Sequence, residues 1–165
     1  MINIKFIRVD ERLIHGQVLN KWLEVINCNR IWIIDDDVYE EPITRKVLKM
    51  SLPEEVSLNF YNVEKGIEAL KSDVFNEEVI ILFKNLIALY KVIEANIRIN
   101  EVNIARLPYR KGKSEILKNI YISKDEKVLI QELINKKVKL IVQMVPDSIP
   151  INLSEIVKGG TSGKL

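Results

Sequence analysis

The fold is decided by residues 4–26, IKFIRVDERLIHGQVLNKWLEVI, which join a strand pattern to a helix pattern through a charged turn. Residues 4–9 are an apolar, β-branched run of strand length. Further along, apolar residues recur at helical spacing and form one face: Val18, Leu19, Trp22, Leu23 and Ile26. The stretch therefore predicts a buried strand that leads into an amphipathic helix beginning near Gly16 or Gln17.

The same alternation continues along the rest of the chain. Strand-like apolar runs occupy residues 30–34, 56–61, 79–83, 102–105, 120–122 and 138–143. Helical faces lie between most of them, formed by Ile43, Val47 and Met50, by Val63, Ile67 and Leu70, by Leu86, Leu89, Tyr90, Ile93 and Ile97, and by Val128, Leu129 and Leu133. Asn62 and Ser123 are expected helix caps, and Pro42 suits a first helical turn.

Alternating helices and nearly continuous apolar strands are typical of a parallel sheet that helices cover on both faces. We therefore expect an α/β fold with a doubly wound, mostly parallel sheet of about seven strands and one antiparallel edge strand. Residues 106–113, RLPYRKGK, are the clearest loop, because Pro108 and Gly112 break the periodicity. Its basic residues Arg110, Lys111 and Lys113 are either solvated or dock an acidic partner.

The composition indicates one compact domain, since 165 residues with 47% hydrophobic side chains can bury a sizeable core. The 25 basic and 23 acidic residues nearly balance, so no field of one sign favours nucleic acid. The apolar runs are too short to cross a bilayer, and the amino terminus lacks the zones of a secretory signal. A single cysteine, Cys28, fits a reducing compartment, and we expect a cytoplasmic protein.

Ligands of open parallel sheets gather at the carboxyl ends of the strands, and this rule sorts the candidate residues. The residues that follow strand ends are His15 after the first strand, Asp35, Asp36 and Asp37 after the second, and Lys84 and Asn85 after the fourth. Cys28 precedes the second strand and therefore lies at the opposite end. The three aspartates are either an acidic metal pocket or helix caps, and capping is favoured for most of them. Lys84 is placed to touch a phosphate, although lysine at such a turn often serves solubility alone.

An imidazole at a helix start suits phosphoryl transfer. Its unprotonated nitrogen can attack phosphorus, and the phosphoramidate formed can hand the group on. Arg8 and Arg12 are candidate donors to the phosphoryl oxygens, and the amides of Gly16 and Gln17 offer an anion site. Asp10 is a candidate to fix the tautomer of the ring. The structural alternative is a packed histidine beside an ion-pair cluster at a strand end.

Several segments form a recognisable set: RVDERLIHGQV at residues 8–18 followed by Trp22, WIIDDD at 32–37, LFKN at 82–85, NIARLPYRKGK at 103–113 and QMVP at 143–146. Together they resemble the enzyme IIB components of the mannose, fructose and sorbose type sugar phosphotransferase systems. The resemblance covers residues 2–158 and implies a single IIB domain over residues 1–158, with residues 159–165 as a tail. Within NIARL this chain has Ala105 and Arg106 where many relatives carry glycine, so the local turn is expected to differ.

The resemblance implies a cytoplasmic phosphohistidine carrier, a phosphotransferase component for which we expect no cofactor and no metal. Such a carrier accepts a phosphoryl group from enzyme IIA and passes it to a sugar held by the membrane components IIC and IID. His15 matches the phosphorylated histidine of the family. Arg8, Asp10 and Arg12 match charged positions of the same loop.

Three other interpretations of the sequence stand beside this one. The first is a receiver-like signalling domain that is phosphorylated on a carboxylate among Asp35, Asp36 and Asp37, but the third strand ends in FYN without an aspartate acceptor. The second is a nucleotide-binding domain, for which no glycine-rich loop exists. The third is phosphoryl transfer through Cys28, which lies at the wrong end of the sheet.

Overall fold

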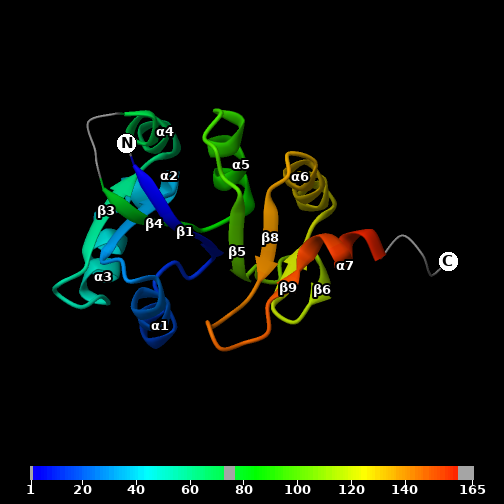
Figure 1. Cartoon of the computed structure of the whole chain (residues 1–165), viewed down its shortest axis with the longest axis horizontal. Helices are drawn as coiled ribbons and strands as arrows, with labels where there is room; N and C mark the ends of the chain where they lie inside the picture. Colours follow the sequence, from blue (N-terminus) through cyan, green and yellow to red (C-terminus); the bar gives the residue numbers. More distant parts are fainter. Residues whose placement is uncertain (1, 73–76, 160–165) are drawn as a thin grey trace.

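The computed structural model describes residues 2–72 and 77–159 (Figure 1). Its centre is a seven-stranded sheet with the strand order β3-β2-β4-β1-β5-β8-β9. These strands are β1 (Asn3–Asp10), β2 (Arg30–Ile34), β3 (Ser57–Tyr61), β4 (Glu78–Phe83), β5 (Glu101–Arg106), β8 (Lys139–Val142) and β9 (Ile151–Asn152). All neighbours pair in parallel except β9, which runs antiparallel to β8 at one edge. The predicted doubly wound, mostly parallel α/β sheet is therefore confirmed.

The helices cover both faces of the sheet (Figure 1). One face carries α1 (Gly16–Ile26) and α3 (Pro42–Met50), and the other carries α4 (Val63–Lys71), α5 (Leu86–Glu94) and α6 (Lys124–Asn135). This division follows from right-handed crossovers, because the chain moves one way along the sheet from β1 to β3 and the other way from β3 to β8. Among the described residues, no helix has the length and apolar character needed to span a membrane.

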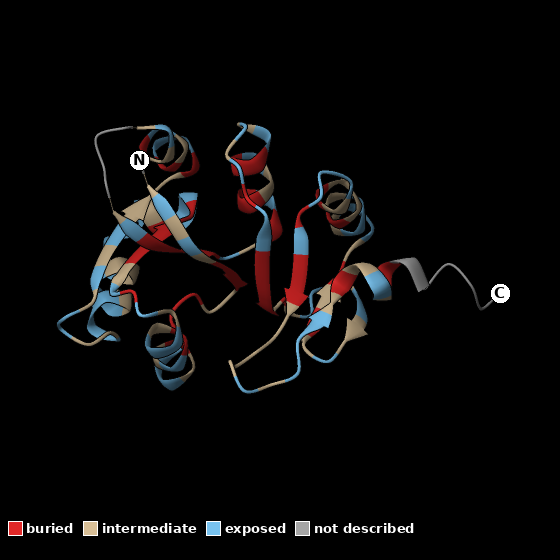
Figure 2. Cartoon of the chain, in the orientation of Figure 1, coloured by how far each residue is buried: buried red, intermediate tan, exposed pale blue. Residues whose placement is uncertain are grey.

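Alternating side chains of the central strands feed two separate cores. On the face of α1, the buried residues of β2 and β4 are Ile31, Ile33, Ile80 and Leu82. On the face of α5, they are Trp32, Ile34, Val79, Ile81 and Phe83. Figure 2 shows the resulting band of buried residues along the middle strands. Since each fully buried aliphatic side chain contributes roughly 1.5–3 kcal/mol, this band rigidly supports the loops at its carboxyl edge.

Several short elements depart from the sequence prediction. Residues 120–122 form a strand, β7 (Ile120–Ile122), but it pairs antiparallel with β6 (Ser114–Leu117) in a separate hairpin. The seventh strand of the main sheet is instead β9, which the sequence pattern does not predict. Nor does it predict β6 or the short helices α2 (Asp36–Glu40) and α7 (Leu153–Gly159). Of the predicted tail, Gly159 ends α7, and residues 160–165 lie outside the described residues.

The predicted helix boundaries depend on caps that the structure shows. The Asn62 side chain accepts a hydrogen bond from the Lys65 amide at 2.8 Å and begins α4. Ser123 and Glu126 form a complete capping box at the start of α6. Pro42 occupies the first turn of α3, where its missing amide hydrogen costs nothing.

One predicted apolar face is present but does not pack on the sheet. Ile43, Val47 and Met50 share a face of α3 as their spacing predicts, yet they are 80%, 57% and 75% exposed. Helix α3 contacts the core through the partly buried Leu48 instead. Periodicity identified the apolar face correctly, but it did not show which side of the helix packs on the core.

Candidate functional site

The loop after β1 is held tightly although its tip is exposed. The Leu13 amide donates to the Asp10 carbonyl at 2.9 Å and closes a turn, in which Leu13 has a left-handed backbone with φ of 56°. Leu13 and Ile14 are buried in the core on the α1 side of the sheet. His15 follows directly and is exposed. Two anchored apolar residues therefore place the imidazole at the surface, at the carboxyl edge of the sheet.

His15 is also the N-cap residue of α1. Its carbonyl accepts from the Val18 amide at 3.1 Å, while its side chain makes no capping hydrogen bond. The amides of Gly16 and Gln17 belong to the first helical turn and have no intrahelical acceptor. Gly16 has a left-handed φ of 31°, and nothing lies within 4 Å of the position a Cβ would occupy. The start of α1 is therefore open to an anion beside the imidazole.

Beneath the loop lies a cluster of charged groups formed by the buried Arg8 and Asp10 and the partly exposed Arg12. Arg8 Nη2 donates to Asp10 Oδ2 at 3.1 Å, and both side chains are only 2% exposed. Arg12 donates two hydrogen bonds to the same carboxylate, from Nε to Oδ1 at 3.0 Å and from Nη2 to Oδ2 at 3.0 Å. Burial lowers the pKa of the Arg8 guanidinium, and Asp10 acts against this shift. The carboxylate thus joins the strand to the turn that carries His15.

Arg8 further ties β1 to the ends of β5 and β8. Its Nη1 group donates to Asn103 Oδ1 at 2.7 Å and to the Gln143 carbonyl at 3.3 Å. Its Nη2 group reaches the Met144 carbonyl at 3.2 Å, which also accepts from Trp22 Nε1 at 3.1 Å. The sequence pattern predicts no role for Asn103 or for these carbonyls. For Asn103, the one indication of a role in the sequence was a polar residue within a strand expected to be buried.

The predicted site residues therefore separate into two layers. His15, Gly16 and Gln17 are exposed, whereas Arg8 and Asp10 are buried below them. Arg12 lies between the layers, with its side chain 24% exposed. Its Nη1 group donates no hydrogen bond to any residue that the structure describes. Within the same residues, the His15 ring makes no hydrogen bond to Asp10.

The basic loop between β5 and β6 lies next to the loop of His15. Glu11 pairs with Arg106 at 3.1 Å and with Arg110 at 3.4 Å, so a single carboxylate links the two loops. Lys113 instead pairs with Glu126 at 2.7 Å, and both side chains are largely buried. The Arg110 side chain is 66% exposed, and Lys111 is exposed too. Arg110 and Lys111 are therefore exposed basic side chains of this loop, and Arg110 also keeps its ion pair with Glu11.

The aspartates after β2 mainly serve as caps. Asp35 caps α2 by accepting from the Val38 amide at 3.0 Å, and Asp36 accepts from the Val63 amide at 2.8 Å. Asn85 likewise caps α5, and Lys84 is exposed beside it. Within the described part of the chain, no three His, Cys, Asp or Glu residues lie where they could hold a metal ion.

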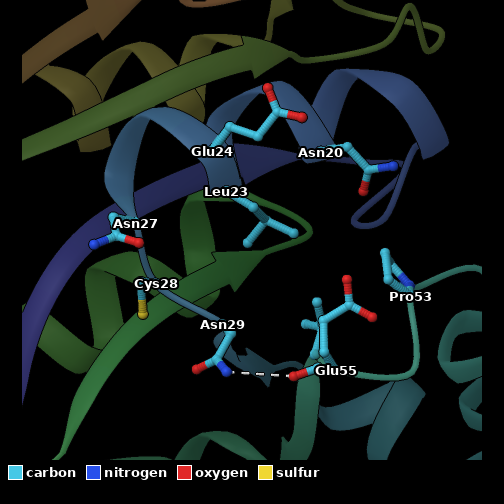
Figure 3. A pocket seen from close by; sticks show the side chains of 9 residues that line it. Asn20, Leu23, Glu24, Asn27, Cys28, Asn29, Pro53 and Glu55 are labelled. Carbon is cyan, nitrogen blue, oxygen red and sulfur yellow. Dashed lines mark hydrogen bonds between the residues drawn. The ribbon is translucent and has the colours of Figure 1, made fainter.

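Cys28 lies at the opposite end of the sheet from His15. Its thiol is buried, with Sγ 3.5 Å from the Glu78 carbonyl and 3.6 Å from the Arg30 carbonyl. The residue borders a pocket of about 440 Å³ between α1 and the segment before β3 (Figure 3). Around it the pocket is lined by Asn20, Leu23, Glu24, Asn27, Asn29, Pro53, Glu55 and Val56. None of the described residues that line this pocket is cationic.

The fold and this edge define a doubly wound α/β protein with an exposed histidine at an open helix start, where β1 meets β5. Comparison with known proteins makes the class specific. A family model described as PTS system sorbose subfamily IIB component matches residues 4–163. The chain belongs to this family of sugar phosphotransferase system components.

Individual relatives agree with that membership. The sorbose-specific EIIB component of Lacticaseibacillus casei is 32% identical over 143 residues, which are 86% of this chain and 87% of that protein. The mannose-specific EIIAB component of Escherichia coli strain K12 is 31% identical over 121 residues, or 73% of this chain and 37% of that protein. The crystal structure of the IIBSor domain of the sorbose permease from Klebsiella pneumoniae superposes with a TM-score of 0.90 at 28% identity, covering 95% and 97% of the two chains.

Proposed function

We propose that this IIB component is a phosphohistidine carrier in which His15 accepts a phosphoryl group from an enzyme IIA and donates it to a sugar. The observation that carries the proposal is the exposed imidazole beside the amides of Gly16 and Gln17, which have no intrahelical acceptor at the start of α1. The family membership supports the phosphotransferase class. The sugar would be bound by the membrane components IIC and IID, and the carrier would work in the cytoplasm.

The chemistry consists of two displacements at phosphorus. First, the lone pair of an unprotonated His15 nitrogen forms the N–P bond while the bond between phosphorus and the IIA donor breaks. Then a sugar hydroxyl oxygen forms the O–P bond, the N–P bond breaks, and the hydroxyl proton is released. Phosphoryl transfer mainly requires positioning and stabilisation of charge on the equatorial oxygens. The amides of Gly16 and Gln17 suit that task without any cofactor.

The roles that we propose for the charged residues follow from how deeply each side chain is buried. Arg12 is the side chain we assign to the phosphoryl oxygens, because it is partly exposed and its Nη1 group donates to none of the described residues. Arg8 and Asp10 are assigned as positioning residues, because their hydrogen bonds hold the loop from below. Lys84 is a weaker candidate, since it is exposed after β4 but contacts no other site residue that the structure describes.

Both partners must reach His15 in turn, so their interfaces should be small and transient. The joined EIIAB relative supports an enzyme IIA as one of them, because its name places IIA and IIB in one component. The exposed Arg110 and Lys111 are proposed to dock an acidic surface of that partner. Charge reversal at both positions should slow transfer from IIA. Arg98 is an exposed arginine that precedes β5, at the opposite end of the sheet from His15, and Arg98→Glu should not slow the transfer.

The test is transfer of labelled phosphate from phosphoenolpyruvate through the general phosphotransferase proteins and a cognate IIA. The expected label survives alkali, is lost in acid, and is absent from His15→Ala but retained in Cys28→Ser. Arg12→Ala should slow transfer by about one to two orders of magnitude, since one charge-stabilising donor is lost. A label that maps to Asp35, Asp36 or Asp37 would establish the receiver-like alternative and end the carrier proposal.

A further inference from the structure

The segment after β8, residues 143–148, is braced by its own side chains. Gln143 Nε2 donates to the carbonyls of Pro146 and Ser148 at 3.0 Å and 2.7 Å. The Ser148 hydroxyl donates to the Val145 carbonyl at 2.8 Å. The segment contains the QMVP stretch, to which the proposed phosphoryl transfer gives no role. Because these hydrogen bonds bridge the turn, the segment is built to hold a side chain in one place.

Met144 is the residue of this segment that contacts the charged cluster most closely with its side chain. Its backbone carbonyl accepts hydrogen bonds from Arg8 Nη2 at 3.2 Å and from Trp22 Nε1 at 3.1 Å. Its sulfur lies 3.4 Å from Arg12 Nη2, within hydrogen-bond distance for a thioether acceptor, and 4.0 Å from Arg8 Nη2. Two donors therefore fix the backbone of Met144, and its sulfur lies against Arg12.

The sulfur completes the acceptors around one side of the Arg12 guanidinium. A guanidinium has five N–H donors in one plane, one on Nε and two on each terminal nitrogen. Asp10 accepts from Nε and from Nη2, both at 3.0 Å, and the Met144 sulfur is a further acceptor for Nη2. The two Nη1 hydrogens are the donors of Arg12 that no described residue accepts. They are therefore the part of the guanidinium left for a phosphoryl oxygen.

We propose that Met144 is a positioning residue of phosphoryl transfer, which holds the Arg12 guanidinium so that Nη1 is presented to the phosphoryl oxygens. The inference rests on the proposed carrier function, in which Arg12 is the side chain assigned to those oxygens. Held by Asp10 alone, through two parallel hydrogen bonds, the guanidinium plane can still tilt about its bonded edge. A third contact, from the segment after β8, restricts that tilt. Orientation matters because a donor stabilises the transition state only where it meets the developing charge.

A thioether suits this position better than an oxygen acceptor. Sulfur is uncharged and accepts only weakly, so it neither repels a phosphoryl dianion nor competes with its oxygens for Nη1. A carboxylate at the same place would form a strong, charge-assisted hydrogen bond with Arg12 and occupy donors that the phosphoryl group needs. The structural alternative is that Met144 only fills space beside the two guanidiniums, as methionine often does. The two roles differ in whether the effect of Met144 depends on Arg12.

The experiment is a double-mutant cycle between Met144 and Arg12, measured as the kinetics of phosphoryl transfer from phosphorylated enzyme IIA to the full chain. Met144→Leu keeps the side-chain volume but removes the acceptor. We expect it to lower kcat about threefold, as for the loss of one weak hydrogen bond, with the KM for IIA unchanged. In the Arg12→Ala background, Met144→Leu should have no further effect, because no guanidinium is left to position. Met50→Leu, at an exposed methionine of α3, is the matched control and should leave kcat unchanged.

Two kinetic results would overturn the proposal. The first is a Met144→Leu variant as fast as the wild type, and the second is an equal loss in both backgrounds, which would show that Met144 acts by packing alone. NMR of the Arg12 guanidinium tests the contact without any transfer: rotation about the Cζ–Nη2 bond should be faster in Met144→Leu, and unchanged rotation would also overturn the proposal. A wild type that accepts no phosphoryl group on His15 would instead contradict the carrier function itself, so the two failures are distinguishable.

Discussion

Replacing Arg8 by methionine tests the claim that a buried arginine builds the platform under His15. Methionine keeps a long unbranched stem but removes every donor of the guanidinium. Four of the five acceptors of Arg8 would retain another donor: Asp10 and the Met144 sulfur keep Arg12, the Gln143 carbonyl keeps Asn103 Nδ2, and the Met144 carbonyl keeps Trp22. Asn103 Oδ1 would be left without the 2.7 Å bond that it now accepts.

The expected cost follows from these contacts. Breaking a buried ion pair from one side costs about 3–5 kcal/mol, and Asp10 keeps one of its two arginines, which favours the lower end. An unsatisfied buried acceptor costs about 1–3 kcal/mol and is part of that sum. We therefore expect Arg8→Met to lower the free energy of unfolding by about 3 kcal/mol. Arg8→Lys should cost less, because it keeps a charge for Asp10 but cannot reach all the acceptors with one ammonium.

The assay is urea unfolding followed by circular dichroism. With a slope of roughly 2 kcal/mol per molar urea, the midpoint should fall by roughly 1.5 M. Arg98→Met, at an exposed arginine, is the control and should change stability by less than about 0.5 kcal/mol. If Arg8→Met lost no more than the Arg98 control, the guanidinium would not be holding the loop, and the assignment of Arg8 as a positioning residue would be wrong.

Three further predictions concern the scaffold and its titration. Gly66→Ala should lower the free energy of unfolding by about 1–2 kcal/mol, because the new Cβ would lie 3.0 Å from two Ile34 carbons. The measurement is thermal unfolding, and an unchanged melting temperature would show that the Ile34 side chain moves aside without cost. Ser123→Ala breaks the capping box of α6 and should cost about 1 kcal/mol in urea unfolding, whereas a neutral effect would mean that Glu126 caps the helix alone. The hydrogen bond to Glu132 raises the pKa of Tyr90 from 10.0 to about 12, so the neutral phenol is favoured in the folded state. Its contribution to stability is present below pH 10 and is lost as the pH rises toward 12; absorbance titration should show a late tyrosine that Tyr90→Phe removes, and an unaltered curve would contradict the shift.

The strands that the sequence predicted well are those buried on both faces. Residues 30–34 and 79–83 are continuous apolar runs, and the structure forms β2 and β4 there. Residues 120–122 look the same in sequence, but whether a three-residue run joins the main sheet or a hairpin depends on distant pairing partners. The stripe of Ile43, Val47 and Met50 shows the same limit, because helical spacing reveals an apolar face without revealing what covers it.

The exposed part of the candidate site was predictable because it follows from topology. A histidine after the first strand of a parallel sheet must lie at the carboxyl edge, and the structure places His15 there. The buried layer was not predictable to the same degree. Arg8 donates hydrogen bonds to the backbone carbonyls of Gln143 and Met144. Every residue has a backbone carbonyl, so the residue types do not indicate these contacts. That Arg8 faces inward and Arg12 partly outward depends on a turn with a left-handed Leu13.

The proposed carrier function depends on His15 as the phosphoryl acceptor. The most direct measurement is mass spectrometry of the intact chain, and of its peptides under alkaline conditions, after incubation with phosphorylated enzyme IIA. One added phosphoryl group is expected on the peptide that contains His15, and none on His15→Ala with the same partner. A phosphoryl group on any other residue of the wild type, or one that persists in His15→Ala, would contradict the proposed carrier function.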